Sequence, residues 1–362
     1  MHGGISDDRI GGILMKTIHG GDIYRNHVTL DFSVNMNPLG IPESVKEALH
    51  AAVDRCHTYP DIHAEQLKTA VGEMIGIFGE KLIFGNGASE LFIAIVHALQ
   101  PKHVVIPVPS FYGYEHAAAA VAAHVEYVPM KEENHFLPGD ELFSSLTDGV
   151  DMLFLANPNN PTGVRMEKED LKRIAMHCRE KHITVVLDEC FIEFCEDHDS
   201  MLDQLEELDN LILERAFTKI FTIPGVRLGY LVCRNEEIRE KISRQLPEWN
   251  LSTFAQMAGV ACAKETQFVS GTAKYLKMER EALLDGLKQV PGMDCTVYPG
   301  AANFLLLKSS KPLYQKFLAH GILIRDCSNF RGLGAGYYRV AVKTKEDNEQ
   351  LLKVAGEINW NE

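Results

Sequence analysis

The chain has 362 residues, of which 46% are hydrophobic and 24% charged, close to ordinary globular usage. This length suits one large and one small domain that share an interface. The net charge of −14 excludes a general binder of nucleic acids or anionic membranes, because phosphate backbones attract a basic surface; a few local arginines can still bind a small phosphorylated ligand.

The composition also indicates the cellular compartment of the protein and whether it binds a metal. The eight cysteines include no C-x-x-C pair, which favours thiols in a reducing cytosol over disulfides or a zinc site. No apolar stretch approaches the length of a membrane span, and the N-terminus lacks a signal-type apolar core. We therefore predict a soluble cytoplasmic protein without a metal, and a mobile, dispensable leader over residues 1–14.

The middle of the chain alternates β-branched runs with helical patterns, which is typical of βα units around a mainly parallel sheet. The predicted strands are Leu82–Gly85, His103–Pro107, Val125–Val128, Asp151–Leu155, Thr184–Asp188, Leu211–Glu214 and Gly229–Cys233. The predicted helices are Ser44–Cys56, Ile62–Met74, Ser89–Leu99, Tyr112–Ala123, Lys168–Lys181 and Glu236–Gln245.

The pattern changes near residue 248. A long helix is predicted over Ala255–Val290, then strands at Thr296–Tyr298, Asn303–Leu307, Ile322–Arg325 and Tyr337–Val342, and a last helix over Lys345–Ile358. We predict three parts: an N-terminal arm, 1–42, packing near the small domain; a large domain, 43–247; and a small α/β domain, 248–362.

Two turns rich in small or polar residues follow predicted strands. Phe84-Gly-Asn-Gly87-Ala88-Ser89 opens a helix, where free N–H groups attract a phosphate, although such turns are common in any α/β protein. Asn157-Pro-Asn-Asn160-Pro-Thr-Gly163 is either a plain turn or a way to place Asn160 at the carboxyl edge of the sheet, where ligands bind in α/β folds.

A carboxylate and a lysine follow two further strands. Asp188 ends the run Ile183–Leu187, and Lys219, predicted at a strand end, precedes Arg227 by eight residues. Taken singly, a strand-end acid often caps a helix, a lysine is most often solvated, and an arginine is most often an ion-pair partner. Together, an amine able to form an imine and an acid able to protect a ring-nitrogen proton are what pyridoxal phosphate requires of a protein.

With these motifs in this order, the chain resembles the fold-type I pyridoxal-phosphate enzymes of the aspartate aminotransferase superfamily over essentially its whole length. That resemblance implies a large domain with a mainly parallel seven-stranded sheet, a smaller α/β C-terminal domain, pyridoxal 5′-phosphate as cofactor and a homodimer with shared active sites. Lys219 then matches the Schiff-base lysine, and Asp188 matches the partner of the ring nitrogen.

The resemblance assigns further roles residue by residue. Asn160 matches the donor to the ring 3-oxygen and Phe111 the aromatic stacked on the ring. The turn Gly87-Ala88-Ser89 matches the phosphate contacts, joined by Thr218 and Arg227. Tyr59 resembles a tyrosine that reaches the neighbouring subunit's cofactor, and Arg339 an arginine that receives a substrate carboxylate.

Two positions depart from the common pattern. Ala216 stands where many relatives carry a Ser or Thr that helps to bind the phosphate, which predicts one contact fewer. Phe191 replaces a tyrosine that many aminotransferases direct at the ring 3-oxygen, which leaves Asn160 as the main donor there.

Within the superfamily two reactions compete. The segments His19-Gly-Gly-Asp, Asn35-Met-Asn-Pro-Leu-Gly, Asp188-Glu-Cys-Phe-Ile-Glu and Ile322-Leu-Ile-Arg325-Asp resemble L-threonine-O-3-phosphate decarboxylases of cobalamin synthesis. Histidinol-phosphate aminotransferases share this frame but usually lack the His-Gly-Gly opening, which by itself is equally a flexible loop. We expect decarboxylation to 1-amino-2-propanol O-phosphate, with His19, Asn35, Asn160, Arg325 and Arg339 binding the substrate; amino transfer to 2-oxoglutarate is the alternative.

Rivals of another class are a non-catalytic protein on the same fold and a plain nucleotide-binding α/β protein. Retention of Lys219 and Asp188 disfavours the first, and the lack of a G-x-G-x-x-G fingerprint after an early strand disfavours the second.

Overall fold

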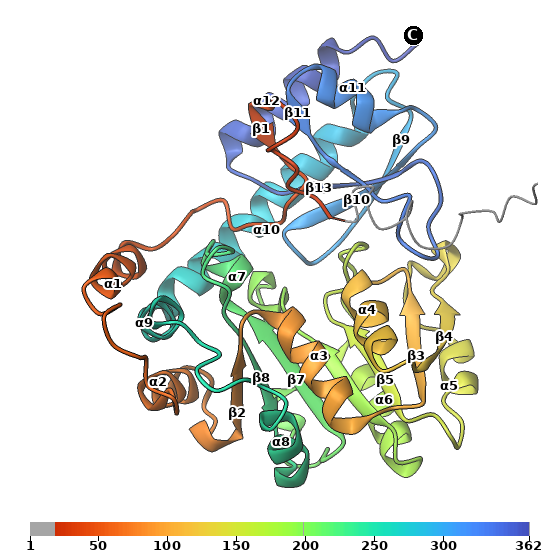
Figure 1. Cartoon of the computed structure of the whole chain (residues 1–362). Coiled ribbons are helices and arrows are strands. Elements are labelled where there is room, and N and C mark those ends of the chain that lie inside the picture. The colour runs from red at the N-terminus through yellow and green to blue at the C-terminus, as the bar shows by residue number, and fades with distance from the viewer. Residues whose placement is uncertain (1–18, 198, 362) are drawn as a thin grey trace, which may run out of the picture.

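The computed structural model describes residues 19–197 and 199–361. The predicted leader, 1–14, lies outside these residues. The described chain forms a lower part built on a broad sheet and an upper part built on a smaller one, with the long helix α10 (Thr266–Lys288) rising between them (Figure 1).

The broad sheet has seven strands in the order β2-β8-β7-β6-β5-β3-β4. Strand β8 is antiparallel to both of its neighbours, and the other strands run parallel, which confirms the predicted mainly parallel sheet. The bounds are β2 Leu82–Gly85, β3 His103–Val108, β4 His124–Pro129, β5 Met152–Ala156, β6 Thr184–Asp188, β7 Leu211–Ala216 and β8 Gly229–Cys233. All seven predicted strands are therefore present, with ends shifted by at most two residues.

Each face of this sheet carries its own apolar core, because successive side chains of a strand point to opposite faces. On one face, Val104 and Phe154 pack against helices α3 (Ala88–Leu99), α4 (Tyr112–Ala120) and α8 (Glu236–Ser243). On the other face, Val105 and Leu153 belong to a core that includes α6 (Lys168–Glu180). Because the central strands are covered on both faces, each is a continuous run of hydrophobic residues in the sequence. Such runs made these strands easy to predict.

The upper part contains a four-stranded antiparallel sheet in the order β12-β13-β10-β9. Its bounds are β9 Cys295–Tyr298, β10 Phe304–Ser309, β12 Arg325–Asp326 and β13 Tyr337–Ala341, with helices α11 Leu313–Ala319 and α12 Lys345–Glu357. Near it, the N-terminal strand β1 (Leu30–Asp31) pairs in parallel with β11 (Ile322–Leu323). The arm thus lies against the C-terminal part of the chain.

Two predicted elements are divided in the structure. The helix predicted over 255–290 is interrupted at residues 263–265, so that α9 (Thr253–Cys262) packs on α1 (Glu43–Val53) and α2 (Glu65–Ile75), whereas α10 packs on α12. The strand predicted over 322–325 becomes β11 and β12 because the two halves pair with different strands, β1 and β13. Since α9 packs on the large domain, we propose that the domain boundary lies after α9 rather than at 248.

Several short elements had no counterpart in the sequence predictions. They are β1, α5 (Asp140–Ser145), α7 (Phe217–Ile220) and α11. Lys219 consequently lies in the short helix α7, just after β7, and not at a strand end as predicted. Among the described residues, no helix is both long and apolar enough to cross a membrane.

Candidate active site

A cavity of about 380 Å³ lies where the arm, the large domain and the C-terminal part meet. From the large domain it is reached by residues at the carboxyl ends of strands β5, β6 and β7, where ligands of α/β folds bind. Its lining residues include His19, Ser33, Asn35, Ala88, Ser89, Phe111, Asn160, Asp188, Cys190, Phe191, Ala216, Thr218, Lys219, Arg227, Arg325, Phe330 and Arg339.

Lys219 extends into this cavity from α7, and the arm fixes its backbone. The backbone N–H of Asn37 donates to the carbonyl of Lys219 at 3.1 Å, and the Asn37 amide donates to the carbonyl of Ile220 at 2.8 Å. Burial, and after it the charges of Arg339 and Arg227, lowers the pKa of Lys219 to about 8. The amine is therefore available as a nucleophile near neutral pH to a far greater extent than an exposed lysine.

Asp188 is buried at the end of β6 and is held by two donors. The hydroxyl of Tyr114 donates to Asp188 Oδ2 at 2.5 Å, and the backbone N–H of Cys190 donates to Oδ1 at 2.9 Å. Burial raises the pKa of Asp188, and these two hydrogen bonds oppose the shift because they favour the ionised form. A carboxylate in such surroundings is further stabilised by a cation, such as a protonated ring nitrogen, placed in the cavity.

A second acid lies behind Asp188 on the neighbouring strand. Glu214 is fully buried and accepts a hydrogen bond from the Cys190 thiol at 3.0 Å. Burial, and then the charge of Asp188, raises the pKa of Glu214 well above its ordinary value. One carboxylate oxygen each of Asp188 and Glu214 and the Cys190 sulfur lie within 4.8 Å of one another, so the cavity wall at Asp188 is backed by a second acid.

The start of α3 forms the opposite end of the cavity. Gly87 precedes the helix with φ 82° and ψ 167°, and no side chain caps the helix N–H groups. A Cβ on Gly87 would lie 2.5 Å from Nη2 of Arg227. A free helix N-terminus beside a guanidinium suits a phosphate dianion.

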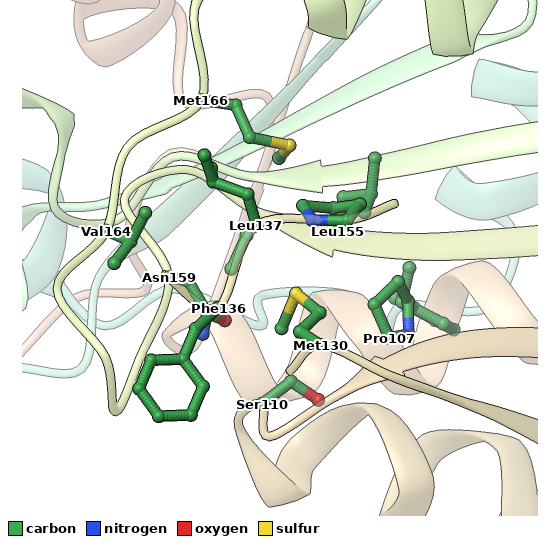
Figure 2. A pocket seen from close by; sticks show the side chains of 12 residues that line it. Pro107, Ser110, Met130, Phe136, Leu137, Leu155, Asn159, Val164 and Met166 are labelled. Atoms are coloured by element: carbon green, nitrogen blue, oxygen red, sulfur yellow. The ribbon is translucent and has the colours of Figure 1, made fainter. Parts of the chain in front are cut away.

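The turn at residues 157–163 is held by hydrogen bonds from the side chain of Asn159. The Asn159 amide donates to the carbonyl of Pro109 at 3.0 Å and to Thr162 Oγ1 at 2.9 Å. Under the turn, Figure 2 shows a mainly apolar hollow of about 10 Å³, lined by residues that include Met130, Phe136 and Asn159. This hollow is barely large enough for one water molecule, so we interpret it as a packing void and not as a ligand site. Asn160, the next residue, lines the large cavity.

Two arginines and a histidine line the substrate side of the cavity. Arg339 is buried, donates to Asn160 Oδ1 and donates to the Ser33 carbonyl at 3.0 Å; burial lowers its pKa to about 10. Arg325 donates to Asn329 Oδ1 at 2.8 Å, and burial lowers its pKa. Burial also lowers the pKa of His19, followed by the nearby charge of Arg325. The two buried arginines favour anionic ligands, and the neutral imidazole of His19 can add a hydrogen bond to such a ligand.

The glycines after His19 fix its position. A Cβ on Gly20 would lie 2.3 Å from the Ser33 carbonyl oxygen, and the Gly21 N–H donates to Ser33 Oγ at 2.7 Å. This close approach brings the ring of His19 to 6.4 Å from the ring of Phe111. The His-Gly-Gly opening is thus a packed turn at the cavity.

The structure brings together nearly all of the predicted site residues. Twelve of the fourteen line the cavity, and Gly87 contacts Arg227 at its rim. Tyr59 lies elsewhere: it is 80% exposed, and its ring contacts that of Trp249 in a tilted arrangement with 4.8 Å between ring centroids. Its predicted role at a neighbouring subunit's cofactor stays a prediction.

Sequence reasoning missed Ser33, Tyr114, Cys190 and Phe330. Tyr114 lies in the first turn of the predicted helix, three residues after Phe111, which directly precedes that helix; this short spacing was a usable signal. Ser33 and Phe330 are in irregular segments, where no periodicity indicates direction.

Comparison with known proteins agrees with this geometry. The family model for aminotransferase class I and II matches residues 28–354. The chain is 34% identical over 351 residues to threonine-phosphate decarboxylase of Salmonella typhimurium, covering 94% of this chain and 96% of the relative. It is 31% identical over 332 residues to histidinol-phosphate aminotransferase of Methanocaldococcus jannaschii, covering 90% and 87%. The crystal structure of histidinol-phosphate aminotransferase from Clostridium acetobutylicum superposes with a TM-score of 0.85 at 30% identity, covering 91% of this chain and 98% of that one.

The chain therefore belongs to the aminotransferase class I and II family, with the fold-type I architecture. It is an enzyme of the pyridoxal-phosphate-dependent class, and the resemblance seen in its sequence is confirmed.

Proposed function

We propose that this enzyme decarboxylates L-threonine O-3-phosphate to (R)-1-amino-2-propanol O-2-phosphate. The observation that carries the proposal is the pair of buried arginines, Arg325 and Arg339, on the substrate side of the cavity, with His19 beside them. A substrate with both a phosphate and a carboxylate needs separate cationic partners for its two anions. The 34% identity to the Salmonella decarboxylase over nearly the whole chain supports the same choice.

The residues present fit pyridoxal 5′-phosphate. Gly87, Ala88, Ser89, Thr218 and Arg227 would hold its phosphate, Phe111 would lie on the ring face, and Asn160 would face the 3-oxygen. Asp188 would hold the ring-nitrogen proton, and Lys219 would hold the aldehyde carbon. When bound, pyridoxal phosphate takes up the electron pair that a broken Cα bond leaves behind.

The remaining chemistry rests on this chain's own groups. Arg325, Arg339 and His19, with Asn35 and Asn160, would orient the substrate so that its Cα–carboxylate bond breaks and carbon dioxide leaves. Lys219 would then deliver one proton to Cα. A lysine with a pKa of about 8 can both hold and release a proton near neutral pH, which this step requires.

The alternative is an aminotransferase of the histidinol-phosphate type that passes an amino group to 2-oxoglutarate. The TM-score of 0.85 to the Clostridium aminotransferase favours it specifically. The two reactions differ in which bond to Cα breaks, and rotation of the substrate about its Cα–N bond decides between them.

We further propose a cytoplasmic homodimer. Three large hydrophobic residues are exposed: Tyr59, Ile62 and Trp249. The rings of Tyr59 and Trp249 are in contact, and Tyr59 lines a groove together with Met257. Burial of this surface by a second copy would explain the exposure and would bring Tyr59 to the partner's cofactor.

Product analysis tests the proposed reaction. Purified enzyme is offered threonine phosphate without a keto acid, and carbon dioxide is measured; in parallel it is offered histidinol phosphate with 2-oxoglutarate, and glutamate is measured. Carbon dioxide in the first tube alone is the expected result, and glutamate in the second alone would contradict it. Lys219→Ala is the control, because it should lose both the visible absorption band of the bound cofactor and the reaction.

A further inference from the structure

The segment 327–336, which joins β12 to β13, is attached to the large domain by one arginine. Arg331 makes a two-bond ion pair with Glu115 of α4: Nη2 donates to Oε1 at 2.8 Å and Nε donates to Oε2 at 3.3 Å. The same guanidinium lies 4.1 Å from the ring centroid of Tyr127 on β4. An arginine that is both paired and stacked is held in one orientation more firmly than a simple surface pair.

The neighbouring residues of this segment contact Arg325. Asn329 accepts a hydrogen bond from Arg325 at 2.8 Å, and the Arg325 guanidinium lies 5.3 Å from the ring centroid of Phe330. Gly332, at φ 86°, comes so close to the large domain that a Cβ there would lie 3.2 Å from the backbone nitrogen of Pro109. The segment is thus fixed on one side of Asn329 and Phe330 by Arg331 and Gly332.

A small cavity of about 30 Å³ connects these groups. Its lining residues include Phe111, Glu115, Arg325, Phe330 and Arg331. Helix α4 therefore carries the ion-pair partner Glu115 next to Tyr114, which binds Asp188, and four residues after Phe111.

We propose that Arg331 and Glu115 are positioning residues for substrate binding: their ion pair fixes the segment 327–336 and thereby places Arg325 in the cavity to receive one substrate anion. The inference rests on the proposed function, because it takes Arg325 as an anion-binding group. Neither residue touches the reacting atoms, so the effect belongs to binding and not to the chemical step.

The test uses the cofactor-loaded enzyme with threonine phosphate. Arg331→Ala and Glu115→Gln should each raise KM roughly 3- to 10-fold, the size expected for a half-exposed pair with a stacking contribution, and leave kcat within about twofold. The double variant should be no worse than either single one, because both remove the same interaction. The dissociation constant of inorganic phosphate, measured by calorimetry, should rise in parallel.

A matched control is available on α6. Arg173 also pairs with an acid, Asp170 at 3.2 Å, and lies 5.0 Å from the ring centroid of Phe143. Arg173→Ala should leave KM and phosphate binding unchanged. The cofactor absorption band and melting temperature of each variant verify that the fold and the cofactor site are intact.

Two results would overturn the proposal: an unchanged KM and phosphate affinity in Arg331→Ala, or additive effects in the double variant. Arg325→Ala distinguishes the two levels of inference. If Arg325→Ala weakens binding and Arg331→Ala does not, only the positioning role is wrong; if Arg325→Ala itself has no effect, the proposed substrate site is wrong.

Discussion

Tyr114 of helix α4 and Asp188 of strand β6 are joined by a hydrogen bond in the protein interior: the tyrosine hydroxyl donates to Asp188 Oδ2 at 2.5 Å. Tyr114 is fully buried and also stacks on Phe154 at 5.2 Å between ring centroids. The carboxylate proposed to bind the ring nitrogen is therefore held by α4, the helix that directly follows Phe111.

Removing this hydroxyl should weaken the hold on the cofactor. Tyr114→Phe leaves the ring packing intact but removes a donor that lowers the pKa of Asp188, so the carboxyl protonates more easily. We expect cofactor affinity to fall by about tenfold, and more at low pH, as followed by absorbance titration. Tyr338→Phe, which removes a hydroxyl donor to the Lys311 carbonyl at 3.1 Å, should leave the affinity unchanged.

A methyl group at the phosphate turn should be more damaging. Gly87→Ala would place Cβ 2.5 Å from Arg227 Nη2 on a backbone at φ 82° and ψ 167°, a region that L-residues avoid. Cofactor affinity measured on the apoenzyme should fall at least about tenfold. Gly76→Ala, at φ 71° with open space around it, is the control; an equal loss there would mean that backbone strain alone explains the result.

Cofactor uptake should depend on pH through Lys219. Its pKa is lowered to about 8. The fraction of Lys219 in the reactive neutral form therefore falls as pH falls through 8, and deprotonation is nearly complete above about pH 9. The rate at which apoenzyme takes up pyridoxal phosphate should rise with pH and level off near pH 9. A rate that keeps rising to pH 10, as for an exposed lysine, would contradict the lowered pKa.

The two parts of the chain are also joined by a partly exposed cluster of hydrogen bonds around Glu132. This carboxylate accepts hydrogen bonds from Lys308 at 2.6 Å and from the hydroxyl of Tyr337 at 2.8 Å, and the Lys308 contact is the first cause that lowers its pKa to about 2. A lowered carboxyl pKa stabilises the fold above the ordinary value of 4.5, and that stability is lost as pH falls from 4.5 towards 2.

Glu132→Gln should accordingly lower the melting temperature at pH 7 by a few degrees, and the difference from the wild type should shrink at pH 3. Glu141→Gln is the matched control, because Glu141 makes a single exposed ion pair with Lys131 at 2.6 Å. A difference that persists at pH 3 would show that the effect does not come from the charge of Glu132.

The sequence identified the buried strands and the residues at their ends well, for a physical reason. Strands covered on both faces are continuous apolar runs, and a polar residue directly after such a run must lie at the sheet edge, as Asp188 and Asn160 do. Short elements that depend on tertiary pairing, such as β1 with β11, carry no local signal.

Two of the differences from the predicted elements have the same cause. The break at residues 263–265 reflects packing partners that differ on its two sides, and the short helix around Lys219 depends on the arm, whose Asn37 donates to the Lys219 carbonyl. Both the helix break and the short helix are determined by contacts between distant segments. The periodicity of hydrophobic residues within one sequence window gives no information about such contacts.

The most direct measurement of the central claim uses threonine phosphate that carries deuterium at Cα. Decarboxylation breaks only the bond to the carboxylate, so mass spectrometry of the aminopropanol phosphate product should show the deuterium fully retained, with one carbon dioxide released per product. Loss of the deuterium to water together with formation of a keto acid would show that the Cα–hydrogen bond breaks instead, and it would contradict the proposed reaction.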